Sequence, residues 1–297
     1  MVVQLAGSKG HDFSLLAECL KQFEDEELVF IPNPGNAGDM LINLGMYHLF
    51  EQLGVRYVTG SPDQTYPDRV LVYSGGGALI DAYPTAARFF KANHALCKNL
   101  ILLPHTVRAQ PELIAAMDDR CFLFAREANS ETYLNAHRTQ AHVLRTHDLA
   151  FFLDEAAITA APWSRAVLLD KWRRKAWPRF VLKLMRDAML TDPVLHCLRA
   201  DAEATGVDIP AHNHDLSKLF AHGDLSRDSC ATTIKTLRFV MKRFSAIRTN
   251  RLHITVLGAL LDMPVTMLDN SYGKNRDIYD ASIDGYFSNV TFEGAKD

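Results

Sequence analysis

The chain has 297 residues, of which 48% are hydrophobic and 23% are charged, and its formal net charge is −3. This length can bury a large core and suggests two domains of roughly 100–150 residues each. The hydrophobic share is ordinary for a soluble globular protein, and the small negative charge gives no reason to expect nucleic acid as a partner.

The cysteines and the N-terminus indicate a cytoplasmic protein. The five cysteines are scattered without a C-x-x-C pair, and Cys19, Cys121 and Cys197 sit among apolar neighbours. Such a set favours buried thiols in a reducing compartment over a disulfide framework. Residues 1–10 show no basic stretch followed by an apolar run, and no run of about 18 apolar residues exists to span a bilayer.

The first half of the chain alternates short apolar strands with helices. We expect strands at 28–31, 55–58, 70–73, 100–103, 122–124 and 142–144, and helices near 13–23, 40–53, 79–97, 111–119 and 127–136. This alternation with short loops predicts an α/β fold with a parallel, doubly wound sheet. Ligands bind such sheets at the carboxyl ends of the strands, and the motifs below fall at such ends.

The turn Gly35-Asn36-Ala37-Gly38-Asp39 joins the first strand to the following helix. Its glycines allow a close backbone approach, so successive N–H groups there can cup an anion or a hydroxyl. Asp39 either caps the helix or accepts a proton from substrate, and both interpretations stay open.

Gly75, Gly76 and Gly77 follow the strand at 70–73 and suggest a second stretch of backbone held against a ligand. A plain tight turn is the alternative. Neither glycine loop has the dinucleotide spacing G-x-G-x-x-G, and no G-K-[ST] is present, so NAD and ATP sites are not indicated.

The segment from Trp163 to Leu190 has a distinct composition. It holds all three tryptophans and eight Lys or Arg against two Asp, a net charge of +6 that leaves −9 for the rest. Basic residues interleaved with apolar ones are typical of a surface that contacts an anionic membrane, and a solvated connector is the alternative. The predicted domains are therefore 1–155 and 191–297, with 156–190 as a basic connector.

The second domain is expected to begin with a strand at 195–198. Arg199 follows it and either faces the site or forms a surface salt bridge with Asp201 or Glu203. Residues 206–229 look irregular, and a helix is expected near 232–244.

A helix at 251–261 leads into a buried strand at 265–268. Arg251 and His253 stand at its start, where the helix macrodipole disfavours cations by a few tenths of a kcal/mol up to about 1. An anion bound between them would explain this placement. A surface arginine and a satisfied core histidine are the alternative.

Several of these stretches resemble motifs of the polysaccharide pyruvyl transferase family. Arg251-Leu252-His253, the apolar helix, the proline-led strand and Lys274-Asn275 resemble its C-terminal signature. The turn Gly35 to Asp39, the glycine triplet, Arg126-Glu127 and Asp148 to Phe151 match its other motifs. Many members have a further glycine-rich turn where this chain has Pro104-His105-Thr106, and an exposed imidazole there can still donate a proton.

The resemblance implies an activity and an architecture. Members transfer an enolpyruvyl unit from phosphoenolpyruvate to a sugar as a pyruvate ketal, with phosphoenolpyruvate as co-substrate. We expect no cofactor and predict no metal ligands, and whether the reaction requires a metal stays open. Two Rossmann-like domains would face a cleft, as in GT-B glycosyltransferases. The acceptor would be a sugar of an exopolysaccharide or cell-wall glycan precursor on a lipid carrier, at the inner face of the membrane. Binding phosphate and carboxylate together calls for several cations, preferably arginine.

The resemblance assigns a catalytic set and a binding set. His253 is the expected acid or base, Arg251 contacts the donor anion, and Asp39 orients or deprotonates the sugar. Whether His253, His105 or Asp39 transfers the proton stays open. The predicted substrate-binding residues are Asn36, Gly38, Gly75, Gly76, Gly77, His105, Arg126, Arg199, Asn250, Lys274 and Asn275.

Two other functions remain possible on the same fold. A glycosyltransferase using a nucleotide sugar would need a ribose-binding carboxylate and a base-stacking pocket, and neither is evident. A non-catalytic carbohydrate-binding protein would have little need for cations at a helix N-terminus.

Overall fold

The computed structural model describes residues 5, 7–173, 181–187, 193–201, 203–220 and 223–294, with the backbone alone at 170–173. The chain divides into two compact units, which we call the N-terminal unit (1–34 and 45–152) and the C-terminal unit (35–44 and 153–297). This division differs from the predicted domains: residues 35–44 group with the C-terminal unit, and so do the described residues of 156–190.

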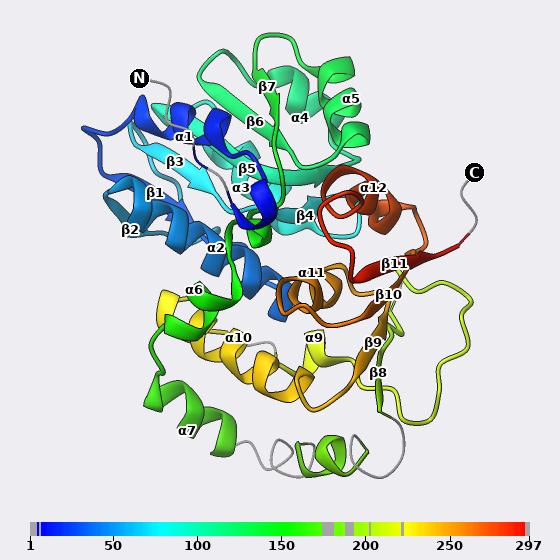
Figure 1. The fold of residues 1–297 in the computed structure, drawn as a ribbon. Coiled ribbons are helices and arrows are strands. Elements are labelled where there is room, and N and C mark those ends of the chain that lie inside the picture. Colours follow the sequence, from blue (N-terminus) through cyan, green and yellow to red (C-terminus); the bar gives the residue numbers. More distant parts are fainter. Residues whose placement is uncertain are drawn as a thin grey trace. The chain divides into compact units, whose positions relative to one another are not determined.

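The N-terminal unit is built on a parallel sheet (Figure 1). Its strands are β1 (Leu28–Ile31), β2 (Tyr57–Thr59), β3 (Val70–Tyr73), β4 (Gly76–Leu79), β5 (Asn99–Val107), β6 (Cys121–Ala125) and β7 (His142–Arg145). They run in the order β2-β1-β3-β5-β6-β7, with β4 paired to β5. Every pairing is parallel, which confirms the predicted sheet.

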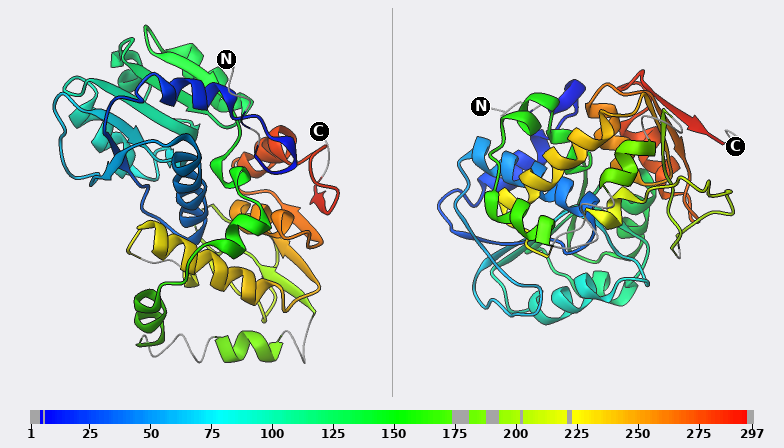
Figure 2. Two further views of the ribbon diagram at one scale, coloured as in Figure 1. Left: turned by 60° about the vertical axis from the view of Figure 1, so that its left-hand side comes forward. Right: turned by 90° about the horizontal axis from the view of Figure 1, so that it is seen from below.

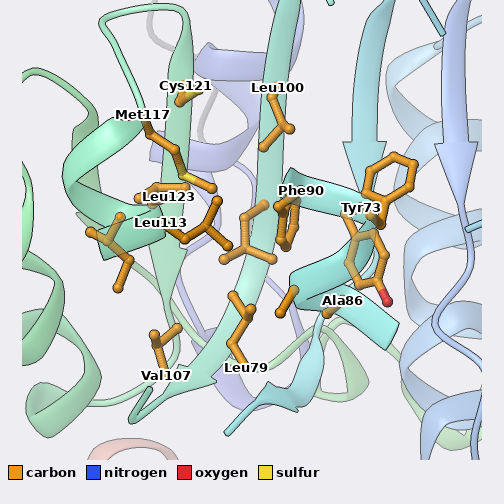
Figure 3. Packing of buried hydrophobic residues seen from close by; sticks show 14 of the residues in the cluster. Tyr73, Leu79, Ala86, Phe90, Leu100, Val107, Leu113, Met117, Cys121 and Leu123 are labelled. Carbon is orange, nitrogen blue, oxygen red and sulfur yellow. The ribbon is translucent and has the colours of Figure 1, made fainter. Parts of the chain in front are cut away.

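Helices connect these strands and cover the sheet. They are η1 (Ser8–Gly10), α1 (Ser14–Lys21), α2 (Ala37–Leu53), α3 (Pro84–Asn93), α4 (Pro111–Ala116), α5 (Ala128–His137) and η2 (Leu149–Phe152). Side chains of α3 and α4, among them Phe90 and Leu113, pack against Leu100 and Leu123 of the strands (Figure 3). This core holds the carboxyl ends of β3 and β5, where the glycine triplet and His105 lie.

The C-terminal unit has a smaller parallel sheet in the order β11-β10-β9-β8. The strands are β8 (Val194–Cys197), β9 (Ala246–Thr249), β10 (Val265–Leu268) and β11 (Val290–Glu293). Its helices are α6 (Glu155–Ala160), α7 (Arg165–Arg173), α9 (Leu216–Leu219), α10 (Arg227–Met241), α11 (Leu252–Leu260) and α12 (Lys274–Ser282), and residues 181–187 are also helical.

Helix α11 packs closely on β9 and β10, and Gly258 makes this approach possible. A methyl group at Gly258 would lie 2.7 Å from Cγ2 of Val265 and 2.9 Å from Cδ1 of Ile247. The first turn of α11 therefore sits at the carboxyl edge of the sheet, with Arg251 and His253 on it.

Three further properties follow from the described residues. No helix among them has both the length and the apolar character needed to cross a membrane. They also contain no group of three or more His, Cys, Asp or Glu that could hold a metal ion. All five cysteines are buried free thiols, which confirms the expectation for Cys19, Cys121 and Cys197.

Candidate active site

The predicted glycine turn forms the start of α2, in the C-terminal unit. Oδ1 of Asn36 accepts a hydrogen bond of 2.7 Å from the N–H of Gly38, and the N–H of Asn36 donates to Oδ2 of Asp39 at 2.8 Å. These reciprocal bonds form a capping arrangement, with Asn36 as the cap and Asp39 returning the contact from the first turn. Of the two interpretations of Asp39, the structure shows the capping role, and the residue is still partly exposed.

Gly38 lies directly against His253. A methyl group at Gly38 would stand 2.7 Å from Nδ1 and 3.0 Å from Cβ of His253, and 2.9 Å from Oδ1 of Asn36. Beside this contact, Leu41 of α2 faces Ile254 and Leu257 of α11 across a small apolar gap. Figures 1 and 2 show the first part of α2 close to α11. Two motifs far apart in the sequence therefore meet, and His253 is partly exposed at their junction.

Arg251 occupies the N-cap position of α11, whose first turn has no side-chain cap. Its guanidinium is buried and paired with two carboxylates. Nε and Nη2 contact Asp215 at 3.0 and 2.5 Å, and Nη2 also contacts Asp201 at 2.9 Å. The sequence predicted an anion beside Arg251, and in the structure these two aspartates provide the negative charge.

Arg199 and Lys274 join the same cluster at the carboxyl ends of β8 and β10. Arg199 contacts Asp201 through Nε and Glu203 through Nη1, both at 2.7 Å. Lys274 reaches the same Glu203 at 2.9 Å. Arg199 therefore does form the salt bridges considered from the sequence, but they are buried, since its side chain is only 6% exposed.

The cations of this cluster keep its carboxyl groups ionised. Burial alone would raise the pKa of Asp201, but the hydrogen bond from Arg199 and the charge of Arg251 outweigh it and lower that pKa to about 2. Burial also acts to raise the pKa of Glu203, and the charge of Lys274 with the hydrogen bond from Arg199 lowers it below its usual range. Both groups are therefore ionised at neutral pH.

The pairing of Asp201 predicts a pH-dependent stability. A carboxyl group whose pKa is lower in the folded than in the unfolded protein stabilises the fold above its ordinary pKa, and this contribution is lost as pH falls through the folded value. A pKa of 3.8 in the unfolded protein and about 2 in the folded protein corresponds to a contribution of about 2 kcal/mol to the free energy of unfolding. This contribution is lost in acid. The free energy of unfolding of the wild type should exceed that of Asp201→Asn by this amount above pH 4, and the excess should disappear by pH 2, as measured by denaturant unfolding. A difference that stays constant with pH contradicts the pairing.

Asn250 and Asn275 tie the strand ends together. Oδ1 of Asn250 accepts from the N–H of Arg199 at 2.8 Å, and the amide of Asn275 donates to the carbonyls of Asn250 and Leu268, each at 2.8 Å. Both were predicted to bind substrate. In the structure they hold the ends of β8, β9 and β10 in place, and their contact with substrate stays a prediction.

The N-terminal unit contains a separate cluster of predicted residues. Arg126 is fully buried: Nη1 pairs with Asp148 at 2.5 Å and Nε donates to Thr106 at 2.9 Å. A methyl group at Gly77 would lie 3.2 Å from Nη2 of Arg126, so this guanidinium supports the glycine triplet. Arg126 is thus paired with Asp148 inside the N-terminal unit, and its contact with the donor stays a prediction.

His105 was predicted to be exposed, and this is wrong. Strand β4 includes Gly76 and Gly77 and pairs with β5 at Gly76 and His105, which encloses the imidazole. Nε2 accepts from the N–H of Ala78 at 2.7 Å. Burial, followed by the charge of Arg126, lowers the pKa of His105 to about 3, so the ring is neutral near pH 7.

Comparison with known proteins identifies the family. The family described as Polysaccharide pyruvyl transferase matches residues 36–272. The chain belongs to the polysaccharide pyruvyl transferase family. The match begins at Asn36 and contains every predicted site residue except Lys274 and Asn275, which follow its end.

One curated relative agrees with this membership, and one solved structure shares the fold. EpsO of Bacillus subtilis (strain 168), provisionally described as a pyruvyl transferase, is 23% identical over 291 residues, covering 88% of this chain and 87% of EpsO. The crystal structure of the uncharacterised protein KP1_0663 of Klebsiella pneumoniae has a TM-score of 0.75 and 23% identity, covering 95% of this chain and 98% of that one. The latter shows a shared fold.

Sequence reasoning missed the acidic half of the candidate site in this family member. Asp201 and Glu203 were considered only as surface partners of Arg199, and Asp215 was not considered. Asp201 and Glu203 follow β8 closely enough to have been candidates. Asp215 lies in the stretch expected to be irregular, and no local pattern marks it.

The Gly38 contact leads to a prediction for the position of the histidine. Gly38→Ala should force the ring of His253 to move, and displacement of a catalytic group by about 1 Å can cost about 100-fold in turnover. Stability should fall little, because alanine favours the helix. Steady-state rates should be compared with those of Gly206→Ala, where a methyl group meets nothing within 4 Å. Equal rates for the two variants would show that Gly38 does not position His253.

Proposed function

We propose that this protein transfers the enolpyruvyl unit of phosphoenolpyruvate to a sugar of an exopolysaccharide or cell-wall glycan precursor, forming a pyruvate ketal. Membership in the family supports a pyruvyl transferase. The observation that carries the donor assignment is the gathering of Arg199, Arg251 and Lys274 beside the uncapped first turn of α11. Phosphate and carboxylate groups are the anions that such a site favours.

The proposed reaction needs one proton donor and two sugar hydroxyls. A proton adds to C3 of the enolpyruvyl group, and the first hydroxyl oxygen bonds to C2. The second hydroxyl oxygen then bonds to C2 as the C2–O bond to phosphate breaks. Of the two hydroxyl protons released, one balances the proton added to C3 and the other leaves on inorganic phosphate. His253 is the proposed acid, since imidazole exchanges protons near neutral pH, and partly exposed Asp39 is the proposed contact to the sugar.

The function can be tested by phosphate release. Purified protein with phosphoenolpyruvate and a panel of sugar acceptors should release inorganic phosphate only when an acceptor offers two suitably spaced hydroxyls. Mass spectrometry of the product should show the acceptor heavier by one pyruvic acid less one water, as ketal formation requires. A product carrying a transferred hexose from a nucleotide sugar, with none from phosphoenolpyruvate, would favour the glycosyltransferase alternative.

We also propose that the segment 163–190 brings the enzyme to a lipid-linked acceptor. Residues 174–180 and 188–190, and the side chains of 170–173, lie outside the described residues, so half of the side chains of this segment are not described. Within the described part, Trp163 is half exposed and Leu182 is 68% exposed, as an interfacial contact requires.

Liposome flotation tests this membrane contact. The protein should float with anionic vesicles at low salt and be released at high salt, because exposed charges are screened within about 10 Å at 0.1 M. Lys183→Gln combined with Arg165→Gln should reduce recovery without changing the rate on a water-soluble acceptor. If no protein floats with the vesicles, or if the recovered amount does not depend on salt, the segment is a connector and not a membrane contact.

A further inference from the structure

Asp201 joins the two arginines of the candidate site. Its Oδ1 accepts from Nε of Arg199 at 2.7 Å, and its Oδ2 accepts from Nη2 of Arg251 at 2.9 Å. Both guanidinium groups are only 6% exposed, whereas Asp201 is 25% exposed. One carboxylate therefore fixes the distance between two buried cations.

Second carboxylates fix the orientation of each guanidinium. Asp215 holds the Nε and Nη2 edge of Arg251, and Glu203 holds Nη1 of Arg199. Among the described residues, none accepts a hydrogen bond from Nη1 of Arg251 or from Nη2 of Arg199. Each arginine thus keeps one amino group available while its plane is held by two contacts.

This arrangement separates two physical roles for the carboxylates. A free arginine loses considerable side-chain freedom when it binds an anion, and a guanidinium that is already oriented loses less. The carboxylates also cancel positive charge, which by itself weakens attraction to an anion. Orientation and charge therefore predict opposite effects when a carboxylate is replaced by a neutral amide.

We propose that Asp201 and Asp215 are positioning residues that hold Arg199 and Arg251 as a preformed receptor for one anionic group of the donor. The inference rests on the proposed function, because it takes phosphoenolpyruvate as that donor. The open amino groups of the two arginines receive the phosphate or the carboxylate as directed hydrogen bonds. Glu203 performs the corresponding task for Lys274 and the far side of Arg199.

The experiment compares donor affinity in neutral amide variants. Asp201→Asn and Asp215→Asn should each weaken phosphoenolpyruvate binding about tenfold or more by calorimetry. This loss is expected although each substitution removes a negative charge and so makes the site more positive. The Michaelis constant for the donor should rise more than turnover falls. The control is Asp280→Asn, which removes an exposed partner of Arg276 in the same unit and should stay within about twofold. Unchanged or tighter binding in both site variants overturns the inference.

A second measurement does not depend on the donor or on activity. In nitrogen NMR of arginine Nε–H groups, Asp201→Asn should remove the protection of Arg199 against solvent exchange and leave that of Arg251, which Asp215 holds. If the Nε–H groups of Arg199 and Arg251 both stay protected from solvent exchange in Asp201→Asn, the inference is also overturned. If the wild type binds phosphoenolpyruvate and both variants bind it with the same affinity, only the positioning role is contradicted. A wild type that neither binds it nor releases phosphate contradicts the proposed function itself.

Discussion

Replacing His253 by alanine is expected to lower turnover by roughly 10²–10⁴, the usual contribution of a positioned acid or base. The affinity for phosphoenolpyruvate should change much less, because the cations of the cluster remain. His253 is partly exposed on the first turn of α11 and touches Gly38, so it is accessible and held in place. Single-turnover rates and calorimetric donor affinity separate the two effects.

The pH dependence of the same variant provides an independent readout. Loss of the proton-transferring group should remove one limb of the pH–rate profile, and His253→Gln, which keeps hydrogen bonding without titrating, should lose the same limb. His94→Ala is the matched control, because this partly exposed histidine lies in the N-terminal unit outside both residue clusters. Wild-type turnover with an intact profile in His253→Ala would make His253 structural, and Asp39 would become the next candidate.

The strands were the most predictable part of the fold. Leu28–Ile31, Val70–Tyr73 and Val265–Leu268 have the predicted bounds, because short apolar runs between turn residues are clear signals of buried parallel strands. The predicted helix at 79–97 instead begins at Pro84 and ends at Asn93. Helix α12 was not predicted, because most of its residues are polar. Strand β11 was not predicted either, although Val290 and Phe292 alternate with Thr291 and Glu293 in it.

The error at His105 has a specific physical origin. Glycine is depleted in strands. Gly76 and Gly77 were therefore expected in a loop, either held against a ligand or forming a tight turn, and not in a strand such as β4. Once β4 pairs with β5, the latter extends from the predicted 100–103 to Asn99–Val107, and His105 lies inside the sheet. Because strand β4 was not predicted, His105 was expected to be exposed, whereas its imidazole is buried and neutral.

The sequence allowed us to predict which cations lie in the candidate site, but not which residues they contact. Arg251, Arg199 and Lys274 follow strand ends, and strand ends of a parallel sheet share one edge. The contact of Gly38 with His253 and the pairing of Arg251 with Asp215 depend on tertiary packing of segments far apart in sequence. Local patterns carry no information on such pairs, so charges that looked available for an anion proved to be paired.

The second large effect is expected at Arg251, where alanine should weaken phosphoenolpyruvate binding by about 2–5 kcal/mol. That substitution also leaves Asp215 without its buried partner, whereas Asp201 keeps Arg199. Leaving a buried charge unpaired can destabilise the fold by about 3–5 kcal/mol. The double variant Arg251→Ala with Asp215→Asn reduces this imbalance and keeps the binding measurement interpretable. Calorimetry on folded protein, checked by circular dichroism, gives the affinity.

Arg251→Lys tests whether charge or geometry matters at this position. Lysine keeps the positive charge, but a single ammonium cannot span both oxygens of Asp215 and also reach Asp201 as the planar guanidinium does. Donor affinity should therefore fall nearly as far as in the alanine variant. Arg276→Lys is the control, because its contact with Asp280 is exposed and a surface pair contributes little. If folded Arg251→Lys binds phosphoenolpyruvate as tightly as the wild type, the guanidinium geometry is irrelevant, and unchanged affinity in the alanine double variant would remove Arg251 from the donor site.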